Sequence, residues 1–358
     1  MALFSASRPG AVSLALQGGG AHGAYTWGVL DALLERGVPL AAASGASAGA
    51  MNAVVLAHGL AVGGPAGGAD AARAALAAFW QAVASSMPAL WHLPGDPPRL
   101  APAAQALLAW SQWLAPAQLN PLDHNPLREV LAAQVDFERL RGTPGMALFI
   151  AATEVERGRL RLVRRHEITL DALLASACLP RFAQAVDIDG RAHWDGAFSA
   201  NPALFPLVRE VAADDLLLIT LAPLGPVAAP TSAADIAART LEIAFNATFL
   251  REARGWAELR ADALKRRWLR TGIERRLARL RWHLICADED LAALPTQTQL
   301  LPEWDFLQRL RDLGRERVAQ WWQEHGDALG RRSSIDLLDV FGQDGETAPR
   351  SEAISRAA

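Results

Sequence analysis

The chain contains 358 residues, enough for one large domain or two smaller ones around a buried core. Hydrophobic residues make up 51% of it and charged residues 20%, which excludes an intrinsically disordered chain. A net charge of −3 provides no overall field that favours nucleic acid, so no nucleic-acid partner is expected. Cys178 and Cys286 both lie in apolar stretches, which predicts buried thiols rather than a disulfide framework or a metal site.

Two features bear on location. The first ten residues lack a charged start followed by an apolar core, so we expect no signal peptide and a cytoplasmic protein. Residues 38–69 contain no Asp, Glu, Lys or Arg, which raises the alternative of a membrane span. Ala, Gly and Ser dominate this run instead of Leu, Ile and Phe, so a buried strand, a turn and a buried helix explain it better.

The predicted elements of the N-terminal half alternate between strand and helix. Residues 12–16 predict a buried strand and residues 22–36 a helix that stops at Gly37. A second strand, a tight turn and a buried helix ending near Gly59 follow. We expect a loop over 63–68, a helix over 69–84, and a Pro- and Trp-rich irregular cap over 85–126 with a short helix around 102–114.

The rest of the chain continues this pattern. A hairpin is predicted across residues 156–158, and a hairpin-like element turns at Asp189 and Gly190. The remaining predictions are helix over 169–177, strand over 215–223, mainly helix from 230 to 281, strand over 281–287 and helix over 303–325. Strands that alternate with helices predict an α/β fold with helices on both faces of a sheet.

The stretch LALQGGGAHGAY, residues 14–25, has the Gly18-x-Gly20-x-x-Gly23 spacing of a dinucleotide-binding loop. Such a loop needs an acidic residue about 20 positions later, at the end of the second strand, to hold the ribose. The corresponding stretch VPLAAASG has no Asp or Glu. The sequence therefore predicts no nucleotide cofactor.

A second glycine motif, Gly45-Ala46-Ser47-Ala48-Gly49, matches G-x-S-x-G between a predicted strand and a predicted helix. This context is typical of a nucleophile elbow, in which a tight turn exposes the serine at a helix N-terminus. The first glycine loop then has another use. Its bare backbone N–H groups suit an oxyanion hole for an ester carbonyl that Ser47 attacks.

The base that would activate Ser47 is less clear from the residues. In the order Ser, acid, His of α/β-hydrolases, only His283 and His325 come late enough, and neither stands in a glycine-rich loop. Asp195 ends a strand-like segment and precedes Gly196 and Ala197, which would leave its carboxylate accessible. His193, two residues earlier, is interpreted as structural support rather than as the base.

Together these motifs resemble the patatin-like phospholipase family. Residues 18–23 look like its oxyanion loop, residues 45–49 its nucleophile elbow, and Asp195-Gly196-Ala197 its Asp-Gly-Gly/Ala motif. ASACLPRF and Asn201-Pro202 also resemble family blocks, and the resemblance spans about residues 12–225. His22 departs from the family pattern, which commonly has Arg or Lys there, so a fixed positive charge beside the oxyanion is in question.

The resemblance implies a three-layer α/β sandwich with a mostly parallel sheet, and a bacterial serine lipid acyl hydrolase. Its dyad would be Ser47 as nucleophile and Asp195 as base, without a catalytic histidine, cofactor or metal. The oxyanion donors would be Gly18, Gly19, Gly20 and Ala48, with His22 and His193 as candidate supporting residues. The alternatives are a general carboxylesterase acting on short-chain or storage-polyester esters, and a non-catalytic lipid-binding member of the fold.

The expected organisation is an N-terminal tail (1–11), a catalytic domain (12–225), a mainly helical extension packed on the same core (226–340) and a flexible tail (341–358). The cap over 85–126 has two interpretations, a lid over an acyl-chain pocket or aromatic packing of the outer core. Residues 265–281 predict a basic amphipathic helix that either contacts anionic lipid, peripherally at the inner membrane face, or is a solvated face.

Overall fold

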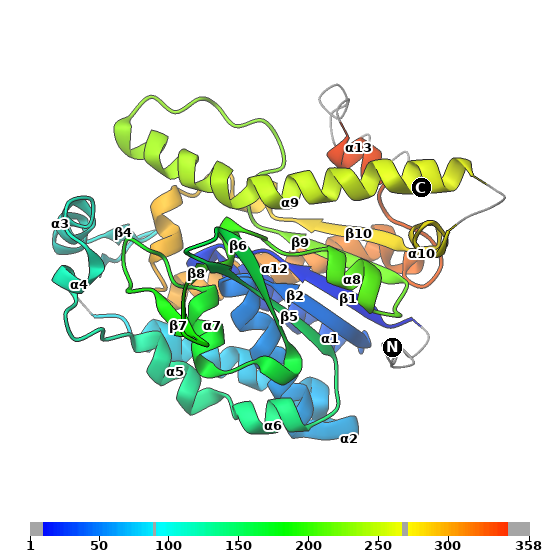
Figure 1. Cartoon of the computed structure of the whole chain (residues 1–358), viewed down its shortest axis with the longest axis horizontal. Helices are drawn as coiled ribbons and strands as arrows, with labels where there is room; N and C mark the ends of the chain where they lie inside the picture. Colours follow the sequence, from blue (N-terminus) through cyan, green and yellow to red (C-terminus); the bar gives the residue numbers. More distant parts are fainter. Residues whose placement is uncertain (1–9, 89–90, 267–270, 343–358) are drawn as a thin grey trace.

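The computed structural model describes residues 10–88, 91–266 and 271–342. Within them an eight-stranded sheet runs through the molecule in the order β10-β9-β1-β2-β5-β8-β7, with β6 paired to β5 (Figure 1). Its strands are β1 (Val12–Leu16), β2 (Leu40–Gly45), β5 (Ala147–Glu154), β6 (Arg159–Arg164), β7 (Val186–Ile188), β8 (Arg191–Asp195), β9 (Asp215–Thr220) and β10 (Arg281–Cys286). A separate two-stranded sheet joins β3 (His92–Leu93) to β4 (Arg99–Leu100).

The five strands from β10 to β5 are parallel to their neighbours, so their carboxyl ends share one edge of the sheet. Strands β6, β7 and β8 are antiparallel to their partners. Strand β6 occupies one edge of β5, and both β2 and β8 pair with the other edge. Strand β2 runs parallel to β5 along its first half, and β8 runs antiparallel to it along its second half. The carboxyl ends of β2 and β8 therefore face each other.

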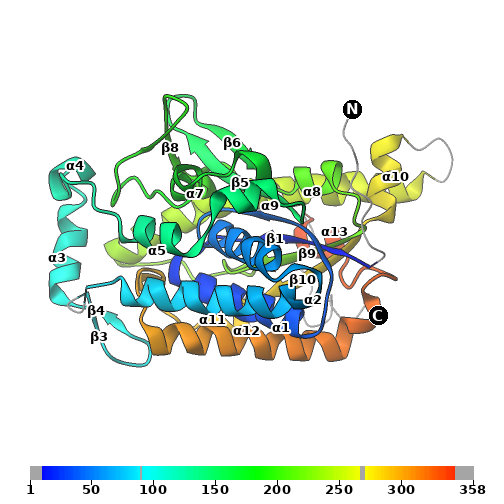
Figure 2. The same cartoon turned by 90° about the horizontal axis from the view of Figure 1, so that it is seen from below.

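Helices cover both faces of the sheet (Figures 1 and 2). One apolar core lies between the sheet and α1, α2, α5, α7 and α12, and contains Leu14 and Leu16 of β1. Ala15, the intervening residue, belongs to the other core, beneath α8, α9, α10 and α13. The longer helices are α1 (Gly23–Glu35), α2 (Ala48–Ser85), α3 (Pro102–Trp110), α5 (Pro126–Gln134), α9 (Ala233–Lys265), α10 (Gly272–Arg279) and α12 (Trp304–His325). The shorter ones are α4 (Pro116–Leu119), α6 (Phe137–Gly142), α7 (Leu170–Ser176), α8 (Phe205–Glu210), α11 (Asp288–Leu291) and α13 (Leu337–Phe341).

This arrangement confirms the predicted three-layer α/β fold with a helical C-terminal region. The expected loop over 63–68 is instead a kink inside α2, where Gly64 has φ 62° and ψ −162° and Pro65 follows. A glycine takes this conformation readily, and a proline lacks the N–H that would continue the helix. The cap contains α3 as predicted, and also the β3–β4 hairpin and α4, which were not predicted.

The prediction of one basic helix over 265–281 is wrong. Helix α9 ends at Lys265, and a new helix begins after Thr271, whose side chain accepts a hydrogen bond from the Glu274 amide. Arg281 already belongs to β10. Residues 267–270 of this segment, like residues 1–9 and 343–358 of the predicted tails, lie outside the described residues. No described helix is both long enough and apolar enough to cross a membrane.

Candidate active site

The register of the sheet brings Ser47 and Asp195 to the same place. Gly45, at the end of β2, aligns with Ile150 of β5, and Asp195, at the end of β8, aligns with Ala152. These positions are two residues apart along β5, about 7 Å at the usual rise of a strand. Strand β1, beside β2, ends at Leu16 and leads into the glycine loop, residues 17–23.

Ser47 has the backbone conformation of a strained elbow, with φ 52° and ψ −127°. Its amide donates to the backbone carbonyl of Ser176 (3.0 Å) and to Ser176 Oγ (3.1 Å) at the end of α7. The flanking glycines are required by close packing, because a Cβ on Gly49 would lie 2.2 Å from the Leu16 carbonyl oxygen. The turn therefore holds Ser47 at the amino end of α2, where the helix dipole favours negative charge.

Asp195 is fully buried and is held on both sides of its backbone. Its amide donates to the Cys178 carbonyl (2.8 Å), and its own carbonyl accepts from Thr153 Oγ1 (2.8 Å). Its side-chain Oδ1 accepts from the Ala197 amide at 2.8 Å. The two anchors, Ser176 for Ser47 and Cys178 for Asp195, lie two residues apart, so the end of α7 sets the spacing of the pair.

Burial raises the pKa of Asp195 to about 7, an effect that hydrogen bonds from the Ala197 amide and the Ser47 side chain only partly offset. Asp195 Oδ2 is buried and has no hydrogen-bond partner of ordinary geometry among the described residues. The contact with Ser47 is therefore looser than a full hydrogen bond, as catalytic pairs commonly are before substrate binds. A carboxylate with this pKa is a much better proton acceptor than an exposed aspartate.

The backbone amides around Ser47 differ in their availability. A Cβ on Gly18 would lie 2.8 Å from Ser47 Cβ, so this loop and the elbow are in direct contact. The Gly18 amide, however, donates to Asn201 Oδ1 at 2.7 Å and is not free to bind an oxyanion. In the described part of the chain, the amides of Gly19, Gly20 and Ala48 have no hydrogen-bond acceptor. Of the four predicted oxyanion donors, these three are available.

His22 is buried in the loop and is not a cation. Its Nε2 lies 2.7 Å from Thr298 Oγ1, and its ring packs edge-on against Phe306. Burial lowers the pKa of His22 to about 4, so the imidazole is neutral at physiological pH. The structure thus holds no fixed positive charge on this side chain where the family commonly has Arg or Lys.

The other candidate histidines lie in structural contacts. His193 is buried on β8, and its Nδ1 is 2.8 Å from the Arg191 carbonyl. His283 is buried between Asp215 (3.0 Å) and Ser334 (3.1 Å), toward the amino ends of β9 and β10. His325 is close enough to His283 for the two to interact electrostatically. None of these side chains hydrogen-bonds to Ser47 in the described residues.

Two residues that support the site were not identified as such from the sequence. Asn201, which binds the Gly18 amide, lies in the Asn201-Pro202 block, whose only signal was its resemblance to the family. Gln17 is buried at the end of β1, where its Oε1 accepts from the Leu221 (2.6 Å) and Ala222 (2.8 Å) amides. Its Nε2 donates to Asn246 of α9 (2.8 Å). A polar residue directly after an apolar strand was the available signal for Gln17.

Comparison with known proteins identifies the family of this chain. The patatin-like phospholipase family model matches residues 14–208, more than half of the chain. The chain belongs to the patatin-like phospholipase family. Membership in this family supports lipid acyl hydrolase activity in general terms. Both Ser47 and Asp195 lie inside the matched range, whereas β9, β10 and Thr298 lie beyond it.

A solved structure is also similar to this patatin-like chain. The crystal structure of VipD from Legionella pneumophila shares 18% sequence identity with it, with a TM-score of 0.34. The alignment covers 86% of this chain and 67% of the VipD chain. No curated protein matches the sequence.

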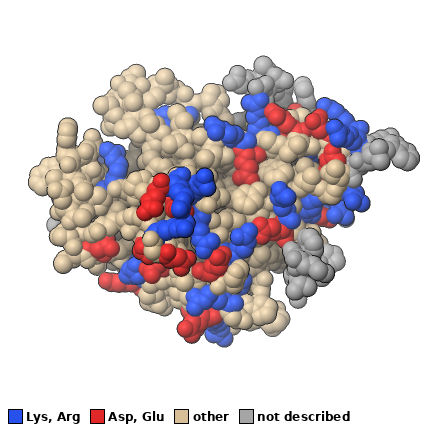
Figure 3. Space-filling view, viewed as in Figure 1, with Lys and Arg blue, Asp and Glu red and all other residues tan. Residues whose placement is uncertain are grey.

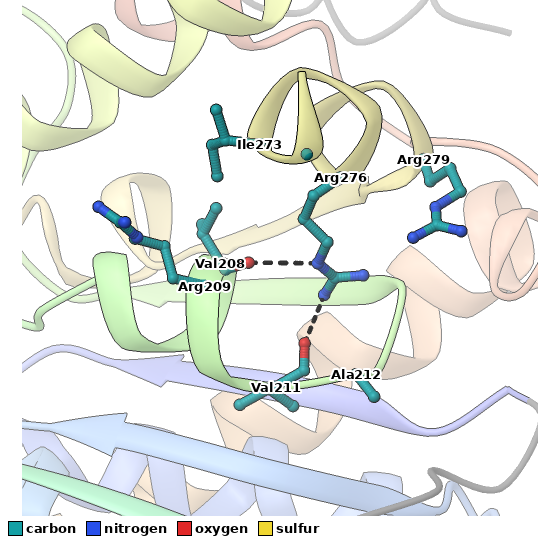
Figure 4. Close-up of a pocket in the computed structure, with 8 residues that line it drawn as sticks. Val208, Arg209, Val211, Ala212, Ile273, Arg276 and Arg279 are labelled. Atoms are coloured by element: carbon teal, nitrogen blue, oxygen red, sulfur yellow. Dashed lines mark hydrogen bonds between the residues drawn. The ribbon is translucent and has the colours of Figure 1, made fainter. Parts of the chain in front are cut away.

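Helix α10, within the basic segment 265–281 of this patatin-like protein, lies at the opposite end of the molecule from the cap helices α3 and α4 (Figures 1 and 2). Arg276 points inward from α10, and its guanidinium binds the Val208 and Val211 carbonyls (Figure 4). It also pairs with Asp214, and Arg281 pairs with Asp215. The pocket lined by Arg276 and Arg279 is at the start of β9, remote from the carboxyl edge that carries Ser47.

Two tryptophans of the cap are not buried as outer-core packing would require. Trp110 and Trp113 are 63% and 87% exposed, so that interpretation is wrong for these two residues. Trp91, in contrast, is half-buried and packs against Leu100, Ala104 and Leu301. Leu90 lies outside the described residues.

Proposed function

We propose that this protein is a serine lipid acyl hydrolase of the phospholipase A or lysophospholipase type, with a Ser47–Asp195 dyad. The observation that carries the proposal is the convergence of β2 and β8 on one edge of β5. This convergence supports the proposal, because a half-buried serine at the elbow then lies beside a buried carboxylate whose pKa is raised to about 7. His22, His193, His283 and His325 have other partners, which supports a dyad without a histidine.

In the proposed reaction, Ser47 Oγ attacks the ester carbonyl carbon and its proton passes to the Asp195 carboxylate. The carbonyl electron pair moves onto oxygen, forming a tetrahedral oxyanion. When this oxyanion collapses, the bond to the alcohol oxygen breaks and Asp195 returns the proton to the leaving alcohol. Water then attacks the acyl-enzyme and its proton passes to Asp195. When this second tetrahedral oxyanion collapses, the bond to Ser47 Oγ breaks, Asp195 returns the proton to Ser47, and the fatty acid is released.

The amides of Gly19, Gly20 and Ala48 would hold the oxyanion, because they have no other acceptor in the described residues. One such donor is typically worth about 3 kcal/mol in the transition state. Gly18 takes a different role in this proposal from the one expected. Its amide ties the loop to Asn201, and its missing side chain lets the loop contact Ser47.

The side of the molecule that meets lipid is proposed to be the cap. Residues 101–122 contain no Asp, Glu, Lys, Arg or His, and they include the exposed Trp110, Trp113 and Leu122. Ala104 of this segment packs on Leu301, close in sequence to the Thr298 that contacts His22, and the Asn120 carbonyl accepts a hydrogen bond from Gln184. This end of the molecule is mostly uncharged, whereas charged side chains gather over the middle and the other end (Figure 3). Tryptophan-rich apolar surfaces are typical of contact with the bilayer interface.

Peripheral membrane contact through 265–281 remains the competing hypothesis. The exposed Arg275 and Arg279 favour it. Against it, Arg266 pairs with Glu274 at 3.2 Å, and the half-buried Arg276 pairs with Asp214, which removes charge from the surface. The division into a catalytic domain (12–225) and an extension (226–340) also remains a proposal. The pairing of β10 with β9 in the same sheet supports the part of this proposal in which the extension packs on the same core.

One experiment separates the proposed function from its alternatives. The purified protein is given p-nitrophenyl esters of increasing acyl length, lysophosphatidylcholine micelles and phosphatidylcholine vesicles, and Ser47 labelling by a fluorophosphonate is followed. Lipid hydrolysis that is lost in Ser47→Ala supports the proposal. Turnover of short esters or polyester alone indicates a general carboxylesterase. Neither turnover nor labelling of Ser47 indicates a non-catalytic lipid-binding protein.

A further inference from the structure

A short segment of the C-terminal region lies directly on the glycine loop. We call residues 295–301, which include the 3-10 helix Thr296–Leu300, the strap. Thr298 of the strap is buried and its Oγ1 lies 2.7 Å from His22 Nε2. The Gln299 carbonyl oxygen lies so close to Gly20 that a Cβ there would be 2.3 Å from it. The strap lies outside the part of the chain that the family model matches.

The hydrogen bonds within the strap determine which group donates. Thr298 Oγ1 has a single proton, which it donates to the Pro295 carbonyl at 2.7 Å. It therefore accepts from His22, and the neutral imidazole carries its proton on Nε2. The contact between Thr298 and His22 is thus a neutral, directional hydrogen bond that fixes the ring and the backbone to which it is attached.

That backbone controls one of the available amides. The His22 amide donates to the Gly19 carbonyl at 3.2 Å. In a trans peptide the carbonyl of one residue and the N–H of the next point in opposite directions. Holding the Gly19 carbonyl toward His22 therefore turns the Gly20 N–H the other way, where no described residue accepts it. Gly20 has no side chain, and at φ +58° it takes a conformation that glycine adopts readily, so no side-chain contact at this residue maintains the orientation.

The strap also reaches the cap. The Leu300 carbonyl accepts a hydrogen bond from Trp91 Nε1 at 3.2 Å, and Leu301 packs against Leu100 and Ala104. Thr298 and Gln299, which contact the glycine loop, directly precede these two residues in the chain, and Thr298 is buried. The strap is therefore held at both ends, by the cap and by the glycine loop.

We propose that Thr298 is a positioning residue that, through His22, keeps the Gly20 amide aimed at the oxyanion site. This inference rests on the proposed function. It assigns a role in that function to a residue outside the range that the family model matches. Thr298 acts on the rate of acyl transfer and not on substrate binding, because the amide it orients holds charge that develops only in the transition state.

The test compares Thr298→Val, which keeps the shape but cannot accept a hydrogen bond, with the conservative Thr298→Ser. The readouts are kcat and KM on p-nitrophenyl butyrate, the rate of fluorophosphonate labelling of Ser47, and Tm. We expect Thr298→Val to lower kcat and the labelling rate by about 10-fold to 100-fold with KM within about twofold. Thr298→Ser should retain most of the wild-type kcat, and the KM values of the two variants should be the same.

Equal kcat in Thr298→Val and wild type, or equal losses in Thr298→Val and Thr298→Ser, would overturn the positioning role while leaving the dyad intact. A wild-type protein that neither turns over esters nor labels at Ser47 would instead reject the proposed function itself. If Thr298→Val does not fold, the pair His22→Gln and His22→Met replaces it. The glutamine amide can still donate to Thr298 and should retain the higher kcat; equal kcat values in the two variants would overturn the proposal.

Discussion

Gly18 donates its backbone proton to Asn201 Oδ1 at 2.7 Å, a contact between residues 183 positions apart. It joins the loop after β1 to the segment that follows Asp195. Asn201 is buried and the hydrogen bond is partly buried, so its loss leaves a poorly solvated, unpaired amide beside Ser47. The relationship predicts that Asn201 supports the rate of hydrolysis without touching the substrate.

We expect Asn201→Ala to lower kcat on p-nitrophenyl butyrate by about tenfold, because the freed Gly18 amide lets the loop relax away from the elbow. A suitable control is Asn125→Ala, which removes the side chain that caps α5. The control should lose about 1 kcal/mol of stability with unchanged kcat. Equal kcat in Asn201→Ala and the control would show that this hydrogen bond is only structural.

The rate should depend on pH through Asp195. The carboxyl must be ionised to accept the Ser47 proton, and burial raises its pKa to about 7. In a buffer series, kcat/KM should rise tenfold per pH unit below pH 7 and level off above it. Asp195→Asn should lower kcat by about 10²-fold to 10⁴-fold and remove this profile. If Asp195→Asn retained near-normal kcat while His283→Ala did not, the dyad assignment would be wrong.

The same burial predicts that Asp195 is costly for stability. A carboxyl with a raised folded-state pKa favours folding only while it is protonated, so its contribution is full below the ordinary pKa of aspartate and is lost as pH rises through about 7. Asp195→Asn should therefore raise Tm by about 2 °C or more at pH 8, with a smaller difference at pH 5. Thermal unfolding of both proteins at the two pH values checks this. A variant less stable than wild type at pH 8 would contradict it.

Lipid contact should depend on the cap rather than on the basic segment. The double variant Trp110→Ala/Trp113→Ala should bind phosphatidylcholine vesicles at least about tenfold more weakly in co-sedimentation, because two exposed indoles are lost. Binding should change little with salt, and turnover of soluble p-nitrophenyl butyrate should be unchanged. The matched variant Arg275→Glu/Arg279→Glu should bind like wild type. Binding that requires anionic lipid, falls with salt and is lost in the arginine variant would favour residues 265–281 instead.

Patterns local in the sequence were sufficient to predict most of the fold. The short apolar runs that begin at residues 12 and 215 are typical of strands buried on both faces of a parallel sheet. The structure has strands there, at Val12–Leu16 and Asp215–Thr220. The elbow was predictable because a tight strand–turn–helix connection needs glycine at 45 and 49. The prediction of a continuous basic helix was wrong because the helical periodicity over 265–281 does not reveal that Thr271 caps a separate helix.

The sequence alone was enough to indicate the patatin-like family and the motifs that carry the candidate site, because these depend on spacing within short segments. Only the tertiary structure decided which groups meet. The opposed ends of β2 and β8 bring Asp195 to Ser47, burial leaves His22 neutral, and Asn201 occupies the Gly18 amide. Thr298 reaches His22 across 276 positions. Such contacts and the pKa values they produce depend on desolvation and packing between distant segments, which no local pattern records.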